Sequence, residues 1–153
     1  MCRQNGHTDF VKYNAEMACK QNENFKKWRD KHRRSQYGFV DMATELMTEH
    51  HWNSITFKEK TLLDDVTYSR IKNKKPKNWK FQTIISVCFG LGTDLNTAAA
   101  MLQSEGYAFG KSPEHLAYAF VLDAMRGDSI DDCNAFLASI NVPMLGNQRR
   151  KDF

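Results

Sequence analysis

Apolar residues recur every three or four positions along this chain, and stretches that alternate apolar and polar residues are absent. Phe39, Met42, Ala43, Leu46 and Met47 give the clearest example, because side chains at i, i+3 and i+4 share one face of an α-helix. The pattern therefore predicts an all-α fold. Helices are expected over residues 10–33, 39–51, 56–62, 64–73, 79–91, 94–106, 112–127 and 129–141.

Residues that start or stop helices lie between these segments. Pro76 predicts a loop, and Gly92 suits the end of the helix before it. Ser112 followed by Pro113 is a typical helix start, because serine accepts bonds from free backbone N–H groups and proline fits the first turn. The other starts are predicted at Thr56 in a capping box with Glu59, at Asp64 or Asp65, and at Asn78, Asp94 and Ser129.

Three segments are expected along the chain. Residues 1–36 are predicted to form a basic N-terminal arm with a polar helix, residues 37–109 a helical domain, and residues 110–153 a helical hairpin with a tail. The apolar faces of the hairpin need cover, which either the core or a second copy of the chain can supply, the latter giving a homodimer. These faces carry Leu116, Phe120, Val121, Phe136, Leu137 and Ile140.

The formal net charge is +4, and the positive residues are concentrated in two stretches, residues 20–34 and 70–80. Duplex DNA is a dense line of phosphates, and each lysine or arginine that neutralises one releases a counterion. A solvated loop on a basic protein is the alternative that charge alone leaves open. The second stretch holds Arg70, Lys72, Lys74, Lys75, Lys77 and Lys80.

The segment TFKEKTLLDDVTYSRIKNKK, residues 56–75, resembles the helix-turn-helix of the Cro/C1 repressor-like (Xre-type) family of DNA-binding domains. The second helix of that motif usually reads Thr, an apolar residue, Ser, Arg, Ile, as residues 67–71 do here. The resemblance covers about residues 39–109. It implies a five-helix lambda-repressor-like domain that binds double-stranded DNA sequence-specifically, as a transcriptional regulator. Lys58 and Leu62 stand where the family usually has Ala and Gly, so the Leu62 turn either avoids positive φ or is strained.

The resemblance also assigns DNA contacts to residues of the motif. Such a motif brings the N-terminal part of its second helix to base edges in the major groove, and Arg70 suits a bidentate contact to guanine. Phe57, Leu63, Tyr68 and Ile71 are expected in the core. Base reading is expected from Asp65, Val66, Ser69 and Arg70, and contact to the DNA backbone from Ser54, Lys72, Asn73, Lys74, Lys75 and Lys77.

The adjacent carboxylates of Asp64 and Asp65 leave a second function open, because they repel phosphate at the helix end that would meet DNA. A helix-turn-helix fold without DNA binding would serve as a protein-interaction adaptor or an antitoxin-like partner. If the protein is instead a dimer on DNA, its two recognition helices would be held about 34 Å apart.

The sequence gives little sign of other chemistry. His50 and His51 are adjacent, whereas helical metal ligands need i, i+3 or i, i+4 spacing, so neither a metal site nor a cofactor is expected. No catalytic motif is found. No run of 18 apolar residues exists, so no membrane span is expected. The protein is predicted to be cytoplasmic, with its cysteines as free thiols.

Overall fold

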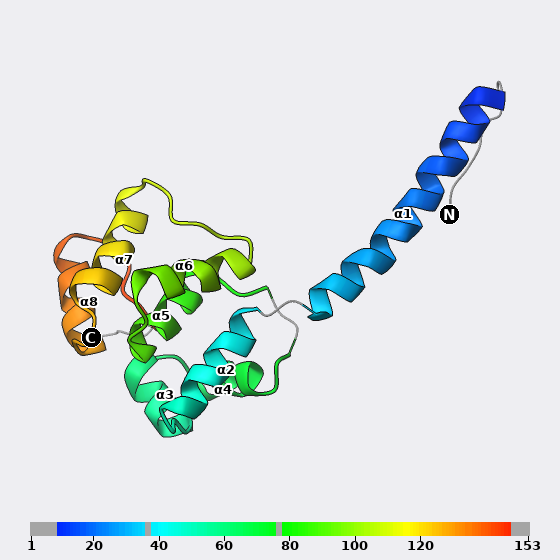
Figure 1. Ribbon diagram of the computed structural model, residues 1–153. Coiled ribbons are helices and arrows are strands. Elements are labelled where there is room, and N and C mark those ends of the chain that lie inside the picture. The colour runs from blue at the N-terminus through cyan, green and yellow to red at the C-terminus, as the bar shows by residue number, and fades with distance from the viewer. Residues whose placement is uncertain (1–8, 36–37, 76–77, 148–153) are drawn as a thin grey trace. The chain divides into compact units, whose positions relative to one another are not determined.

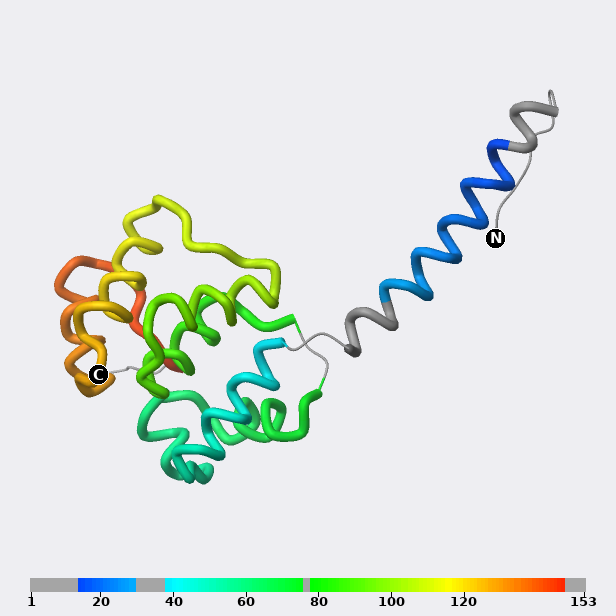
Figure 2. Tube along the Cα trace, in the orientation of Figure 1, coloured from blue at the N-terminus to red at the C-terminus, as the bar shows by residue number. Residues whose placement is uncertain are grey.

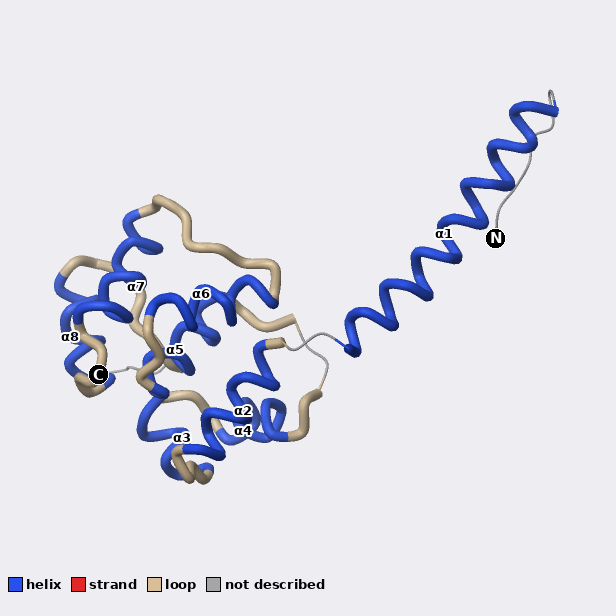
Figure 3. Tube along the Cα trace, in the orientation of Figure 1, coloured by secondary structure: helices blue, strands red, loops and turns tan. Residues whose placement is uncertain are grey.

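Every regular element in the described part of the chain is a helix (Figures 1 and 3). The computed structural model describes residues 9–35, 38–75 and 78–147, with side chains of the first helix described from residue 14 to residue 29. The all-α prediction is thus confirmed for these residues, whereas Lys77 lies outside them. The helices are α1 (Asp9–Ser35), α2 (Phe39–Glu49), α3 (Ser54–Thr61), α4 (Asp65–Lys72), α5 (Phe81–Leu91), α6 (Leu95–Ser104), α7 (Pro113–Ala124) and α8 (Ile130–Ser139).

The chain divides into two compact units, Met1–Gln36 and Tyr37–Phe153. The first contains α1, whose described side chains are mostly exposed, including the apolar Met17 and Phe25. The guanidinium of Arg29 lies over the Phe25 ring, 5.7 Å from its centroid. The second unit contains α2 to α8, whose path is traced in Figure 2.

Helix α5 forms the centre of the second unit. It contacts α2, α3, α6 and α7, and its residues 84–89 are all buried. Such a helix must be apolar around its circumference, which explains its run of apolar residues. The hairpin is tied to it through Tyr118, whose hydroxyl accepts a bond from Gln82 Nε2 (2.9 Å) and donates one to the Pro143 carbonyl (2.7 Å).

Most of the predicted helix starts are confirmed by side-chain bonds to the backbone. Asp94 caps α6, Ser112 caps α7 and Ser129 caps α8, each accepting a bond from the backbone N–H three residues later. Asp64, not Asp65, caps α4. Gly92 ends α5 in the left-handed conformation, with φ of 70°.

Two predicted starts are wrong. Helix α3 begins at Ser54 because Asn53 caps it, accepting bonds from both the N–H and the hydroxyl of Thr56, so Thr56 lies inside the first turn. Helix α5 begins at Phe81 rather than after Asn78. Packing of Trp79 is the reason: its ring meets Phe39 edge-on at 5.3 Å, and its carbonyl accepts a bond from the Tyr107 hydroxyl (2.7 Å), which holds this stretch outside the helix.

The cysteines differ in part from the expectation. Cys88 and Cys133 are free thiols inside the core, and burial raises the pKa of each to about 12. Cys19 in α1 is disulfide-bonded, so the prediction of free thiols is wrong for this residue. Within the described residues, none of the helices has the length and apolar character needed to cross a membrane.

Candidate nucleic-acid interface

Helices α3 and α4 are joined by a three-residue turn, residues 62–64. Leu62 adopts the left-handed conformation (φ 58°, ψ 26°), which glycine adopts without strain and leucine does not. Of the two alternatives for this position, the strained turn is therefore the one found. Thr61 supports the turn, since its hydroxyl donates to the Phe57 carbonyl (2.7 Å) and accepts from Leu63 N (3.1 Å).

Aromatic packing sets how α4 lies against α3. The fully buried ring of Phe57 lies 5.2 Å from Tyr68 and 6.3 Å from Trp52, measured between centroids. Ile71 is also fully buried, and its carbonyl accepts a bond from the Thr44 hydroxyl of α2 (3.3 Å). The predictions that Phe57, Leu63, Tyr68 and Ile71 face the core are confirmed, with Tyr68 half-buried.

The opposite face of α4 is exposed and carries the residues predicted to read bases. Asp65, Val66, Ser69 and Arg70 are all exposed, and Val66 keeps 56% of its surface open to solvent although it is apolar. The Ser69 hydroxyl accepts a bond from Asn73 Nδ2 (3.2 Å), which places Asn73 on the same face. Among the described residues, the Arg70 guanidinium has no hydrogen-bond or ion-pair partner.

Both carboxylates at the start of α4 are engaged within the chain. Asp64 accepts bonds from the N–H (2.9 Å) and hydroxyl (2.8 Å) of Thr67, and these bonds lower the pKa of Asp64. Asp65 pairs with Lys58 of α3, with 3.2 Å between Nζ and Oδ1. Lys58 thus offsets one of the two negative charges.

The basic residues predicted to contact the DNA backbone differ in how they are held. Lys74 has positive φ (52°) and pairs with Asp41 of α2, with 2.9 Å between Nζ and Oδ1, an interaction that lowers the pKa of Asp41. Lys72 and Lys75 are exposed and have no ion pair among the described residues. Ser54 is the half-buried first residue of α3. The cations left open for a ligand here are therefore those of Arg70, Lys72 and Lys75.

Acid is expected to weaken the cap of α4. Because the folded state lowers the pKa of Asp64, this carboxylate stabilises the fold above its unfolded pKa of about 4, and the contribution is lost as the pH falls through the folded pKa. Asp64→Ala should therefore cost about 1 kcal/mol at pH 7, and clearly less at pH 2–3. Urea unfolding of both proteins across this pH range measures the difference. Asp128→Ala, in the loop before α8, serves as the control, and an Asp64→Ala effect independent of pH would contradict the assignment.

The segment after α8 returns to the α3–α4 turn, a feature that the sequence did not predict. The side chain of buried Asn134 forms two hydrogen bonds with the backbone of Leu145: its Nδ2 donates to the carbonyl (3.1 Å), and its Oδ1 accepts from the N–H (2.7 Å). Gly146 N then donates to the Ser86 hydroxyl (2.9 Å), and Asn147 N donates to the Leu62 carbonyl (2.8 Å). We call residues 142–147 the strap. Its contacts hold the strained turn from which α4 begins.

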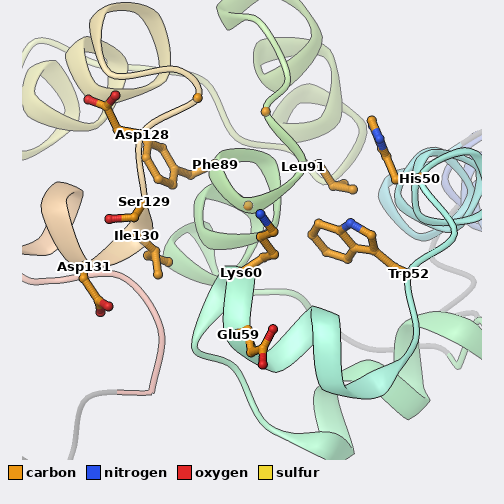
Figure 4. Close-up of a pocket in the computed structure, with 13 residues that line it drawn as sticks. His50, Trp52, Glu59, Lys60, Phe89, Leu91, Asp128, Ser129, Ile130 and Asp131 are labelled. Atoms are coloured by element: carbon orange, nitrogen blue, oxygen red, sulfur yellow. The ribbon is translucent and has the colours of Figure 1, made fainter.

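A cleft of about 520 Å³ lies beside α3, between the loop after α2, the end of α5 and the loop before α8. In Figure 4, His50 and Trp52 lie on one side of it, and Asp128 and Asp131 lie on the other. The polar groups therefore do not converge on one point. None of the residues that line the cleft belongs to α4. No group of three His, Cys, Asp or Glu residues in the described part of the chain could hold a metal ion.

The exposed face of α4, with the cations that follow it, is thus the candidate site. The helical period of the sequence predicted which residues of α4 are exposed. It could not predict the ion pairs of Lys58 and Lys74, because each pair joins residues from different segments of the chain. Comparison with protein-family models, curated proteins and solved structures finds no match to this chain.

Proposed function

We propose that the protein binds double-stranded DNA sequence-specifically and acts as a cytoplasmic transcriptional regulator. Helices α2 to α6 would serve as the five-helix lambda-repressor-like domain, and α4 as its recognition helix. The observation that carries the proposal is the exposed face of α4. It presents the apolar side chain of Val66 and the guanidinium of Arg70, which has no partner among the described residues. Lys72 and Lys75, which form no ion pair there, follow it.

The chemistry of this face suits a major groove. Arg70 can donate two bonds to the O6 and N7 atoms of guanine, and Val66 can contact the methyl group of thymine. Lys72 and Lys75 follow on the C-terminal side, where they would neutralise phosphates without reading sequence. The two carboxylates oppose phosphate less than their charge suggests, because Asp64 caps the helix and Asp65 pairs with Lys58.

Substitutions of Arg70 and Lys75 distinguish the reading of bases from contact with the DNA phosphates. Arg70→Ala should weaken binding to a duplex selected from a random library by about 1–3 kcal/mol and lower the preference for that duplex over a scrambled one. Lys75→Ala should weaken binding to both duplexes alike and lower the salt slope by about 1. Lys74→Ala should change the slope less, because Asp41 already neutralises this lysine. Fluorescence anisotropy over a salt series measures all three.

Lys60→Ala is the matched control, since Lys60 carries the same charge on α3 but lines the cleft. It should leave affinity, preference and salt slope nearly unchanged. Equal losses on the two duplexes for Arg70→Ala would show that Arg70 does not read bases. Absence of binding by the wild-type protein at low salt would reject the DNA-binding proposal itself.

The alternative is a protein-interaction adaptor or antitoxin-like module on the same fold. One observation favours it: Ile55 on α3 is 62% exposed and Val66 on α4 is 56% exposed. Ile55 lies one helical turn before Lys58 on α3, and Lys58 pairs with Asp65, the residue before Val66 on α4. Under this alternative, Val66→Glu would abolish a protein complex, while the wild-type protein would show no DNA affinity at low salt.

A further inference from the structure

The hairpin of α7 and α8 carries apolar side chains that the core does not cover. Leu116 is 57% exposed, Phe120 49% and Ile140 44%, while Phe136 is half-buried with its ring centroid 5.3 Å from that of Phe120. Val121 and Leu137 are buried, so the core takes up only part of the hairpin's apolar surface. We call Leu116, Phe120, Phe136 and Ile140 the hairpin patch.

The hairpin patch is continuous because of the helical period and the antiparallel arrangement. Leu116 and Phe120 are four residues apart on α7, so they lie on one helix face. Phe136 on α8 and Ile140, the C-cap of that helix, are also four residues apart. The loop of residues 125–129 joins α7 to α8, and two helices joined by so short a loop form an antiparallel hairpin. Phe120 contacts Phe136, so in that arrangement we expect Leu116, one turn before Phe120, on the same side as Ile140, one turn after Phe136.

We propose that the hairpin patch is the interface of a homodimer, with a second copy of the chain as its occupant. Large side chains exposed by about half leave on the order of 100 Å² each, or roughly 400 Å² of apolar surface on one copy. An interface of standard size buries about 800 Å² on each partner, with an apolar centre and a polar rim. The hairpin patch therefore has the area that the centre of such an interface needs.

Charges at the two ends of the hairpin patch indicate a second copy rather than an unrelated partner. Lys111 is exposed just before α7, three residues before the half-buried Glu114, whereas Asp123 near the end of α7 and Asp132 near the start of α8 are exposed at the opposite end. Arg126 also lies at that end, but its Nε donates to the Gly92 carbonyl. A two-fold axis that runs across α7 and α8 turns one copy end for end, which brings Lys111 of each copy to the acidic end of the other. The surface is thus self-complementary in charge as well as apolar at its centre.

Analytical ultracentrifugation of the full chain without DNA tests this proposal independently of the proposed function. The wild-type protein should be dimeric in the micromolar range, and Leu116→Glu should raise the dimer dissociation constant at least tenfold. Ile55→Glu is the matched control, because it places the same charge at an equally exposed apolar position on α3 and should leave the dissociation constant unchanged. Circular dichroism should show both variants folded, since neither position is in the core.

A charge exchange tests the two-fold arrangement. Lys111→Glu and Asp123→Lys should each raise the dissociation constant severalfold, and the double variant should restore it, because the exchanged charges again face each other across the interface. A wild-type chain that is monomeric at 200 µM would overturn the proposal. So would equal effects of Leu116→Glu and Ile55→Glu, or a double variant that dimerises more weakly than either single variant.

Discussion

Replacing Phe57 by alanine is expected to lower the free energy of unfolding by about 3–5 kcal/mol. The Phe57 ring is fully buried and touches both Tyr68 of α4 and Trp52 before α3, so its removal leaves a cavity where the two helices meet. A loss of this size is a large fraction of the 5–15 kcal/mol that holds a typical domain together. Urea unfolding followed by tryptophan fluorescence and circular dichroism measures it.

Ile55→Ala provides the control on the same helix, because Ile55 is 62% exposed and its truncation should cost less than about 0.5 kcal/mol. The comparison separates packing from helix propensity, since both variants introduce alanine into α3. A Phe57→Ala loss near that of Ile55→Ala would contradict the packing of α4 on α3. Phe57→Leu should recover most of the stability, because leucine refills much of the cavity.

Local signals in the sequence predicted the helices well where the deciding contacts are themselves local. Asp94, Ser112 and Ser129 cap their helices through bonds that reach only three residues along the chain. The start of α5 was misplaced because it depends on Trp79 packing against Phe39, forty residues earlier. Distant packing of this kind overrides a local cap and leaves no mark in the pattern of neighbouring residues.

The candidate site likewise has features that the sequence predicted and features that depend on distant contacts. Outward placement of Val66, Ser69 and Arg70 follows from the helical period once Tyr68 and Ile71 are assigned to the core. The pairing of Lys74 with Asp41 could not be predicted, because it depends on how α2 lies against α4. That pairing changes the prediction for DNA binding, since it removes Lys74 from the set of open cations.

The sequence also did not predict the strap, although the strap directly holds the turn from which α4 begins. Leucine in the left-handed conformation costs roughly 1–2 kcal/mol, so the α3–α4 turn persists only if its surroundings hold it. The Leu62 carbonyl accepts a bond from Asn147, and a Cβ atom at Gly146 would lie 2.5 Å from Leu62 Cβ, so the strap packs tightly onto the turn. Glycine at residue 146, with φ of 89°, is therefore required by both space and backbone conformation.

Releasing the strap is expected to have the second large effect. Asn134→Ala removes two bonds to the backbone of Leu145 inside the core and should lower the free energy of unfolding by about 2–3 kcal/mol. Part of that loss should appear locally, because the strap holds the turn through Asn147. Amide hydrogen exchange should thus accelerate at Asn147 and Leu63 more than at the centre of α5.

Asn96→Ala is the matched control for this prediction, since Asn96 is exposed on α6 and its truncation should change stability by less than about 0.5 kcal/mol. Exchange at the turn should be unaffected in the control. If Asn134→Ala destabilised the whole unit uniformly, with Leu63 and the centre of α5 exchanging faster by the same factor, Asn134 would be a core residue without a special link to the turn. Preferential exchange at Leu63 would instead mean that the last described segment of the chain fixes where α4 begins.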